Sequence, residues 1–175
     1  TEAVLFDLDG VLTPTALVHE EAWRRLFSPY FEARGLEPYT DADYFEHLDG
    51  RARYDAVESL LRSRGVALEF GTPADSPDAN TVCGLGNRKN KVFNDLVREE
   101  GVDPYPGSVR FLDYLERRGP LKVAVVSSSK NAPAVLEAAG LAGRFQTVVD
   151  GNVAAARKIP GKPAPDTYLD AARQL

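Results

Sequence analysis

Two short apolar runs, Ala3–Phe6 and Leu121–Val126, constrain the fold of this 175-residue chain more than any other feature. Neither run alternates apolar with polar residues, and continuous apolar runs are typical of strands buried on both faces of a parallel sheet. Phe145–Val149 is a third strand candidate. Because parallel strands need crossover connections, which are usually helical, the sequence predicts an α/β fold with helices on both faces of the sheet.

Helical spacing dominates the long segment between the first two strands. The candidate helices there are His19–Phe27, Arg53–Arg64 and Asn90–Glu99, with a loop at Gly71–Ala79. Further helices are expected after Pro106, over Ala132–Ala139 with Gly140 as a left-handed cap, and over Pro165–Gln174. We predict a Rossmann-like α/β core of residues 1–14 and 102–175, interrupted by a helical cap of residues 15–101.

Composition limits the possible partners and compartments. The net charge is −5 and no long basic run is present, so nucleic-acid binding is not expected. The single cysteine, Cys83, excludes an intrachain disulfide and fits a reducing compartment. We find no signal peptide and no apolar stretch near the roughly 20 residues of a membrane span. The expectation is a monomeric cytoplasmic protein without a membrane partner.

Asp7 and Asp9 directly follow the first strand candidate. In extended backbone a spacing of two points both carboxylates to the same side, where they repel each other unless a cation or a proton intervenes. Magnesium is the usual partner of such hard oxygen ligands. A carboxylate can also attack phosphorus, and a second one can move a proton. The alternative is that Asp9-Gly10 only forms a turn.

Ser127 ends the second strand candidate, and Lys162 lies in Gly161-Lys162-Pro163-Ala164-Pro165-Asp166. A hydroxyl at a strand end can donate to a phosphoryl oxygen, and a lysine there can neutralise its charge. Taken singly, a loop serine that caps a helix and a solvated loop lysine explain these residues better than a catalytic role does.

Together, Val4–Leu12, Ser127 and the Lys-Pro-Ala-Pro-Asp segment resemble the first three motifs of the haloacid dehalogenase (HAD) superfamily. The resemblance implies Asp7 as nucleophile, Asp9 as general acid/base, Ser127 and Lys162 as catalytic residues, and Mg²⁺ bound by Asp7 and the Asp9 carbonyl. The superfamily's fourth motif, an acidic pair that completes the metal site, is not found before Leu175. We therefore expect that the C-terminal part of the core is missing, which leaves a weak magnesium site and an exposed sheet edge.

Within the superfamily the resemblance is closest to the β-phosphoglucomutase family. It implies that Arg53, Ser129, Lys130 and Asn131 bind the second phosphate of a sugar bisphosphate. It also implies that Gly50 and Arg51 line the sugar, that Lys89 belongs to a specificity segment, and that His19 helps the proton exchange of Asp9. Thr15 and Trp23 have family-like spacings, although Trp23 fits core packing better. Pro14 replaces the family's usual Asp or Asn and restricts Thr13, so motion at the cap hinge is in doubt.

The function predicted from this resemblance is interconversion of β-D-glucose 1-phosphate and β-D-glucose 6-phosphate through an aspartyl-phosphate and a glucose 1,6-bisphosphate. The alternative is a sugar-phosphate phosphatase on the same scaffold, with water as the final acceptor. A non-catalytic fragment is the third possibility, and only the absent fourth motif favours it.

Overall fold

The computed structural model describes residues 2–175, which form two compact units. The sheet unit contains the residues up to Ala16 and those from Gly101 to Leu175. The helical unit contains Leu17–Glu100. Each unit has a buried apolar cluster of its own, so each is described separately.

A parallel sheet forms the centre of the sheet unit. Its strands are β1 (Ala3–Phe6), β2 (Lys122–Val126) and β3 (Thr147–Val149), in the order β1-β2-β3. Phe6 pairs with Val125 and Val126 pairs with Val149, so the carboxyl ends of the strands lie at one edge of the sheet. The predicted α/β class with a parallel sheet is confirmed, with β2 and β3 slightly shorter than expected.

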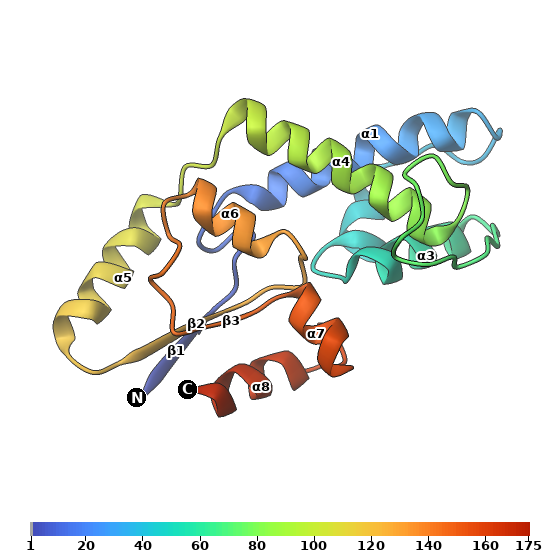
Figure 1. The fold of residues 1–175 in the computed structure, drawn as a ribbon. Coiled ribbons are helices and arrows are strands. Elements are labelled where there is room, and N and C mark those ends of the chain that lie inside the picture. The colour runs from blue at the N-terminus through green and yellow to red at the C-terminus, as the bar shows by residue number, and fades with distance from the viewer. Residues whose placement is uncertain (1) are drawn as a thin grey trace. The chain divides into compact units, whose positions relative to one another are not determined.

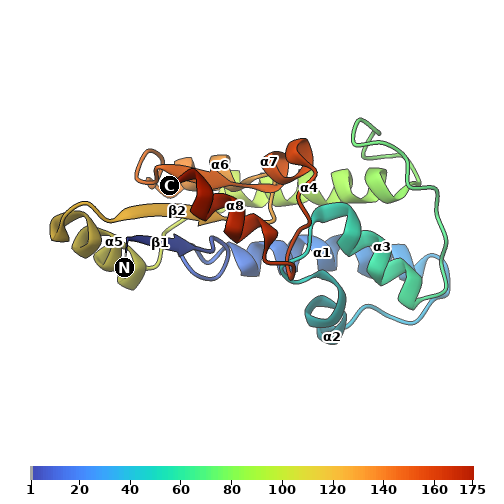
Figure 2. The same cartoon turned by 90° about the horizontal axis from the view of Figure 1, so that it is seen from below.

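Helices cover both faces of this sheet. They are α5 (Pro106–Arg118), α6 (Ala132–Ala138), α7 (Gly151–Arg157) and α8 (Asp166–Gln174). Figures 1 and 2 show α6 and α8 on opposite faces. The Phe111 ring of α5 meets the Phe6 ring of β1 edge-on at 5.8 Å. Gly140 follows α6 with φ of 69°, as expected for a left-handed cap.

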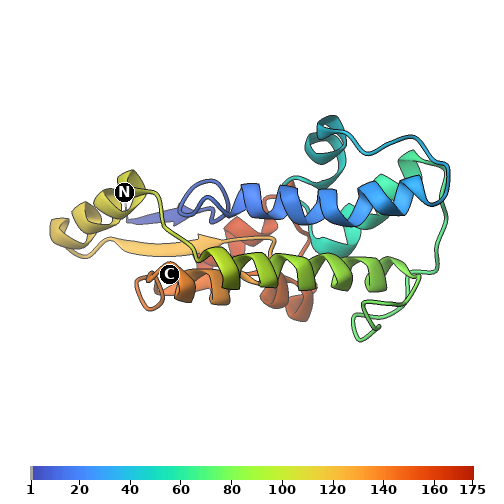
Figure 3. The same cartoon turned by 90° about the horizontal axis from the view of Figure 1, so that it is seen from above.

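The helical unit is built from two long helices and three shorter ones. Helix α1 (Thr15–Glu32) begins in the sheet unit, and α4 (Val82–Glu100) runs beside it (Figure 3). The shorter helices are α2 (Asp41–Asp43), the π-helix η1 (Tyr44–Leu48) and α3 (Arg53–Ser63). Apolar faces of α1, η1, α3 and α4 form the core, with Phe27, Phe31 and Leu60 completely buried. Within residues 2–175 no helix is long and apolar enough to cross a membrane.

Several elements differ from the sequence prediction. Helix α4 begins at Val82 rather than Asn90, and the Thr81 hydroxyl accepts a hydrogen bond from the Gly84 amide in its first turn. The short helix α7 was not predicted, although Asp150 caps it by accepting from the Val153 amide at 2.8 Å. Helices α2 and η1 were also missed, because segments this short carry little helical periodicity.

Candidate active site

Polar residues gather where the parallel strands end. Asp7 follows β1 and Ser127 follows β2, and the register of the two strands brings both to the same edge of the sheet. Ser127 is buried, and its amide donates to the Val149 carbonyl at the end of β3 at 2.9 Å. Ligands of open α/β sheets bind at this carboxyl edge, so it is the place to look for chemistry.

Asp7 and Lys162 form the central contact of this edge. The Lys162 ammonium lies 2.8 Å from Asp7 Oδ1 and also donates to the Val126 carbonyl at 2.9 Å. The Leu8 amide donates to the same Asp7 oxygen. No residue among 2–175 bonds to the other oxygen, Oδ2. The carboxylate is therefore oriented through one oxygen and offers the other to a ligand.

The Asp9 carboxylate lies among the hydroxyl groups of Thr13, Thr15 and Ser127. Its Oδ1 accepts a hydrogen bond of 2.5 Å from Thr15, and the Thr15 and Thr13 hydroxyls lie 2.6 Å apart. Ser127 Oγ reaches Asp9 Oδ2 at 3.4 Å. Gly10 has φ of +82° and its amide donates to the Thr13 carbonyl, so the chain turns directly after Asp9. The two aspartates consequently have different hydrogen-bond partners.

The loop after β2 is held by its own serines. The Ser129 amide donates to Ser127 Oγ at 3.1 Å, and the Asn131 amide donates to Ser129 Oγ at 3.0 Å. The Lys130 carbonyl accepts from the Asn152 side chain at 3.1 Å. Both serine hydroxyls thus accept from local backbone amides, and the Ser127 hydroxyl also donates to Asp9 Oδ2.

Lys89, His19 and Trp23 come together inside the helical unit. Lys89 is only 4% exposed, and its ammonium lies 2.7 Å from His19 Nδ1. It also lies 4.6 Å from the centre of the Trp23 ring and 5.1 Å from that of Phe93. The His19 ring stacks on Phe93. Trp23 itself is 3% exposed and belongs to the core, so it contacts Lys89 rather than offering a stacking face to solvent.

Arg53 is a half-buried cation of the helical unit. Its Nη1 donates to the Asn87 side-chain oxygen at 3.2 Å, and its guanidinium lies 5.7 Å from the centre of the Tyr54 ring. Burial lowers the pKa of Arg53 from its usual value, because desolvation disfavours the charged form. No carboxylate of residues 2–175 forms an ion pair with it. An anion could therefore neutralise this charge.

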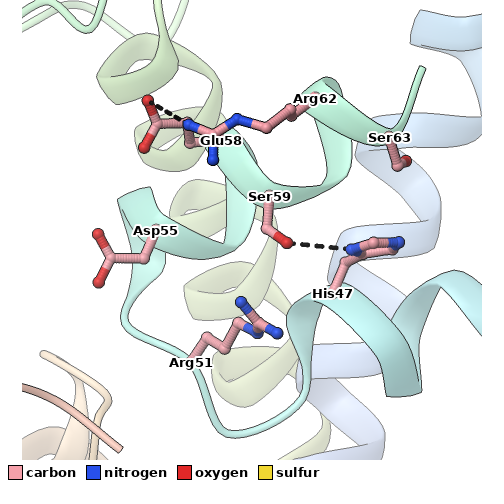
Figure 4. Close-up of a pocket in the computed structure, with 7 residues that line it drawn as sticks. All are labelled: His47, Arg51, Asp55, Glu58, Ser59, Arg62 and Ser63. Carbon is pink, nitrogen blue, oxygen red and sulfur yellow. Dashed lines mark hydrogen bonds and ion pairs between the residues drawn. The ribbon is translucent and has the colours of Figure 1, made fainter. Parts of the chain in front are cut away.

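Gly50 and Arg51 lie shortly before helix α3. Gly50 has φ of +69° and is exposed, and the Arg51 guanidinium donates to the Glu46 carbonyl at 3.2 Å. Arg51 also faces an open groove of about 440 Å³ (Figure 4). The groove is lined by His47, Arg51, Asp55, Glu58, Ser59, Arg62 and Ser63.

Sequence reasoning missed two residues of these clusters. Thr13 is completely buried and extends the hydroxyl set around Asp9, but nothing in its local sequence marks it. Asn87 holds Arg53 from a position 34 residues away along the chain. A contact of that sequence separation leaves no periodic signal in a single sequence.

The donor atoms near Asp7 suit a hard cation only in part. Residues 2–175 contain no group of three His, Cys, Asp or Glu side chains able to hold a metal ion. Asp7 Oδ2 accepts no protein hydrogen bond and is an oxygen ligand of the kind magnesium prefers. The residues present therefore fit a part of a magnesium coordination sphere.

The chain resembles known proteins over nearly its whole length. The chain is 44% identical over 180 residues to the β-phosphoglucomutase of Mycobacterium bovis, a match covering 99% of this chain and 68% of that protein. The structure resembles the β-phosphoglucomutase of Clostridium difficile with a TM-score of 0.76 and 26% identity, covering 99% of this chain and 70% of that one.

A second solved structure is the CbbY protein of Rhodobacter sphaeroides in complex with xylulose 1,5-bisphosphate. It matches with a TM-score of 0.70 and 27% identity, covering 99% of this chain and 72% of that one. The family model described as haloacid dehalogenase-like hydrolase matches residues 1–175. With the Asp7, Asp9, Ser127 and Lys162 segments in the expected order, this chain belongs to the haloacid dehalogenase-like hydrolase family.

Proposed function

We propose that this chain carries the nucleophile of a phosphomutase that interconverts β-D-glucose 1-phosphate and β-D-glucose 6-phosphate. The observation that carries the proposal is the Asp7–Lys162 contact of 2.8 Å, which leaves Asp7 Oδ2 open at the carboxyl edge of the sheet. The resemblance to β-phosphoglucomutases supports a phosphosugar as the substrate. We also propose that the protein acts as a monomer in the cytoplasm.

Asp7 is proposed as the nucleophile. Its Oδ2 attacks the phosphorus of a phosphosugar, the new Oδ2–P bond forms, and the bond between phosphorus and the sugar oxygen breaks. Lys162 stays on Oδ1 and neutralises negative charge as the phosphoryl group arrives. Ser127, whose hydroxyl proton can turn to a phosphoryl oxygen, supplies a further donor. The products of this step are an aspartyl-phosphate and a sugar hydroxyl.

Asp9 is proposed as the general acid and base. It gives a proton to the departing sugar oxygen and later takes one from the hydroxyl that attacks the aspartyl-phosphate. Thr15 orients the Asp9 carboxylate through its 2.5 Å hydrogen bond. Two such transfers through a glucose 1,6-bisphosphate, with reorientation between them, convert one monophosphate into the other.

The second phosphate of the bisphosphate needs cations of its own. In the helical unit we propose Arg53, because its charge has no acidic partner among residues 2–175. In the sheet unit we propose Ser129, Lys130 and Asn131 of the loop after β2. For contacts with the sugar we propose Lys89, His19, Gly50 and Arg51, with Trp23 packed behind Lys89 in the core of the helical unit.

Magnesium is the proposed cofactor. Asp7 and the Asp9 backbone carbonyl would hold it together with oxygen ligands from outside residues 2–175. When bound, the ion supplies positive charge that screens the repulsion between a carboxylate and an incoming phosphate.

The alternative function is hydrolysis of a sugar phosphate on the same scaffold. The description of the matching family as hydrolases favours it. The two functions share the aspartyl-phosphate and differ only in the final acceptor, which is a sugar hydroxyl in the mutase and water in the phosphatase.

The deciding assay uses the protein with Mg²⁺, β-glucose 1-phosphate and a catalytic amount of β-glucose 1,6-bisphosphate, and follows glucose 6-phosphate against free phosphate. A mutase gives glucose 6-phosphate with little phosphate release, and a phosphatase gives the reverse. Arg53→Ala should cripple the mutase reaction by about a hundredfold, because a charged hydrogen bond to the second phosphate is lost. The same variant should largely retain hydrolysis of a small phosphoester.

A further inference from the structure

The side-chain amide of Asn87 uses its full hydrogen-bonding capacity. Its oxygen accepts from Arg53 Nη1 at 3.2 Å and from the Tyr54 hydroxyl at 2.9 Å. Its NH₂ group donates to the carbonyls of Pro73 at 3.1 Å and Asp75 at 2.9 Å. An amide offers two donors and two lone pairs, so Asn87 is saturated and its orientation is fixed.

Gly86 leaves room for the aliphatic part of the Arg53 side chain beside the Asn87 amide. A Cβ atom at Gly86 would lie 3.1 Å from Arg53 Cγ and 2.9 Å from the Tyr54 ring. A side chain at position 86 would push the Arg53 and Tyr54 side chains away from α4, so the glycine lets both lie close to Asn87. The segment Gly84-Leu85-Gly86 thus lies inside α4, where its two glycines allow close packing against neighbouring segments.

The loop that receives the Asn87 NH₂ group is itself braced. Asp75 accepts from the hydroxyls of Thr72 at 3.1 Å and Thr81 at 2.6 Å. The hydrogen bond from the Thr81 hydroxyl, and after it those from the backbone and the hydroxyl of Thr72, lower the pKa of Asp75, so this carboxylate is ionised at neutral pH. Arg88 adds a hydrogen bond of 2.7 Å to the Pro77 carbonyl. Asn87 therefore links Arg53 to a loop of fixed conformation.

We propose that Asn87 is a positioning residue that holds the Arg53 guanidinium ready for the second phosphate of the substrate, an inference that rests on the proposed function. An arginine loses considerable rotamer entropy when it binds an anion. A neighbour that has already ordered the side chain removes part of this cost from the binding step. Asn suits the role because its neutral oxygen orients the guanidinium without cancelling its charge.

A carboxylate at position 87 would act differently. Asn87→Asp keeps the shape of the side chain but replaces the NH₂ group, which donates to both loop carbonyls, by an oxygen. It also places a negative charge next to the Arg53 guanidinium. Such an ion pair competes directly with phosphate for the guanidinium. Asn87→Asp should therefore weaken phosphate binding at least as strongly as Asn87→Ala.

Asn80 provides a matched control in the same unit. Its side-chain oxygen also accepts from a tyrosine hydroxyl and an arginine, namely Tyr30 at 3.2 Å and Arg34 at 3.5 Å. We expect Asn87→Ala to raise the KM for β-glucose 1-phosphate about tenfold, the effect of losing one oriented hydrogen-bonding group. Turnover of para-nitrophenyl phosphate, which has no second phosphate site to fill, should stay within about twofold of wild type. Asn80→Ala should leave both values unchanged.

A binding measurement separates this inference from the proposed function. Inorganic phosphate is titrated into the ¹⁵N-labelled protein while the Arg53 Nε–H resonance, assigned through Arg53→Lys, is followed. The Kd read from this resonance should rise about tenfold in Asn87→Ala and not in Asn80→Ala. The inference would be overturned if the Kd were equal in wild type, Asn87→Ala and Asn80→Ala. It would also be overturned if the Arg53 resonance of the wild type did not shift when phosphate is added. A wild-type protein that transfers no phosphoryl group refutes the proposed function alone, because the titration needs no turnover.

Discussion

At the scale of single residues, Asp7 and Lys162 are distant in sequence but form an ion pair that orients the Asp7 carboxylate. The ammonium holds Oδ1 and the Val126 carbonyl together, so the other carboxylate oxygen keeps one direction. If Asp7 is the nucleophile, as we propose, an oxygen held in one direction needs no reorganisation before it attacks.

Replacing these two residues should affect activity to different degrees. Asp7→Asn removes the nucleophile and should lower phosphoryl transfer at least about a thousandfold. Lys162→Met keeps the nucleophile but removes one stabilising charge, and a loss of about 10²–10³ in kcat is expected. Initial rates with β-glucose 1-phosphate measure both effects, with Lys91→Met, an exposed lysine of α4, as the control. Full activity of Asp7→Asn would rule out the assigned nucleophile.

Asp43 and Arg64 form the most enclosed ion pair of the helical unit. Arg64 donates to both carboxylate oxygens, at 2.9 and 2.7 Å, and both side chains are nearly buried. Burial alone would raise the pKa of Asp43, but the hydrogen bonds from Arg64 and Thr40 outweigh it and lower the pKa below its usual value. The pair thus stabilises the folded state while Asp43 is ionised.

The sign of this shift predicts the pH dependence of stability. A carboxyl group whose pKa is lowered by folding contributes its full stability above its unfolded pKa of about 3.9 and loses it as the pH falls through the lower folded value. Asp43→Asn should cost about 3 kcal/mol at neutral pH, because Arg64 keeps a buried charge without its partner. Urea unfolding at pH 7 and at pH 3 tests this, and the difference between wild type and variant should shrink at pH 3.

At the scale of elements, the first turns of α4 depend on glycines in close contacts. A Cβ at Gly84 would lie 2.2 Å from the Ala79 carbonyl oxygen, a backbone atom that cannot rotate away. Helix propensity alone would favour alanine there by about 1 kcal/mol. The contact should outweigh this preference, since distances that short force the backbone to move.

Gly84→Ala is therefore expected to destabilise the protein, by about 1–3 kcal/mol as for other overpacked sites. Gly107→Ala in α5 is the control, because its Cβ would meet only the end of the Arg110 side chain at 3.9 Å. That control should be neutral or stabilising by up to about 1 kcal/mol. Urea unfolding midpoints compare the two, and equal midpoints would show that α4 and the Ala79 segment can separate at little cost.

At the scale of the whole molecule, the two units have separate apolar cores. They can therefore unfold in separate transitions rather than in a single one. Trp23 is the only tryptophan and lies in the core of the helical unit, so its fluorescence reports on that unit alone. The assignment of this unit as a cap over the active site stays a prediction.

We expect the Trp23 fluorescence and the far-UV circular dichroism to change at different urea concentrations. Asp43→Asn should move the fluorescence transition to lower urea, because it weakens the helical unit, and should leave the hydrogen exchange of the β2 amides unchanged. Coincident transitions that both move in the variant would indicate that the two units unfold together.

The sequence by itself determined the class of fold and the position of the candidate nucleophile. Continuous apolar strands identify a parallel sheet, and parallel strands bring Asp7 and Ser127 to one edge whatever the details of packing. These features are local or follow from topology, so a single chain reveals them. The short helices η1 and α7 escaped prediction because their sequences carry too few residues for a period to show.

Only the tertiary structure decided which oxygen of Asp7 meets Lys162, that Asp9 turns to Thr15, and that Asn87 holds Arg53. Each of these is a hydrogen bond whose direction depends on rotamers and on the close approach of elements. Gly86 permits such an approach between α3 and α4, and its effect is visible only when both helices are in place. Patterning along a chain records which face of an element is buried, but the partner found across the core depends on how the elements pack.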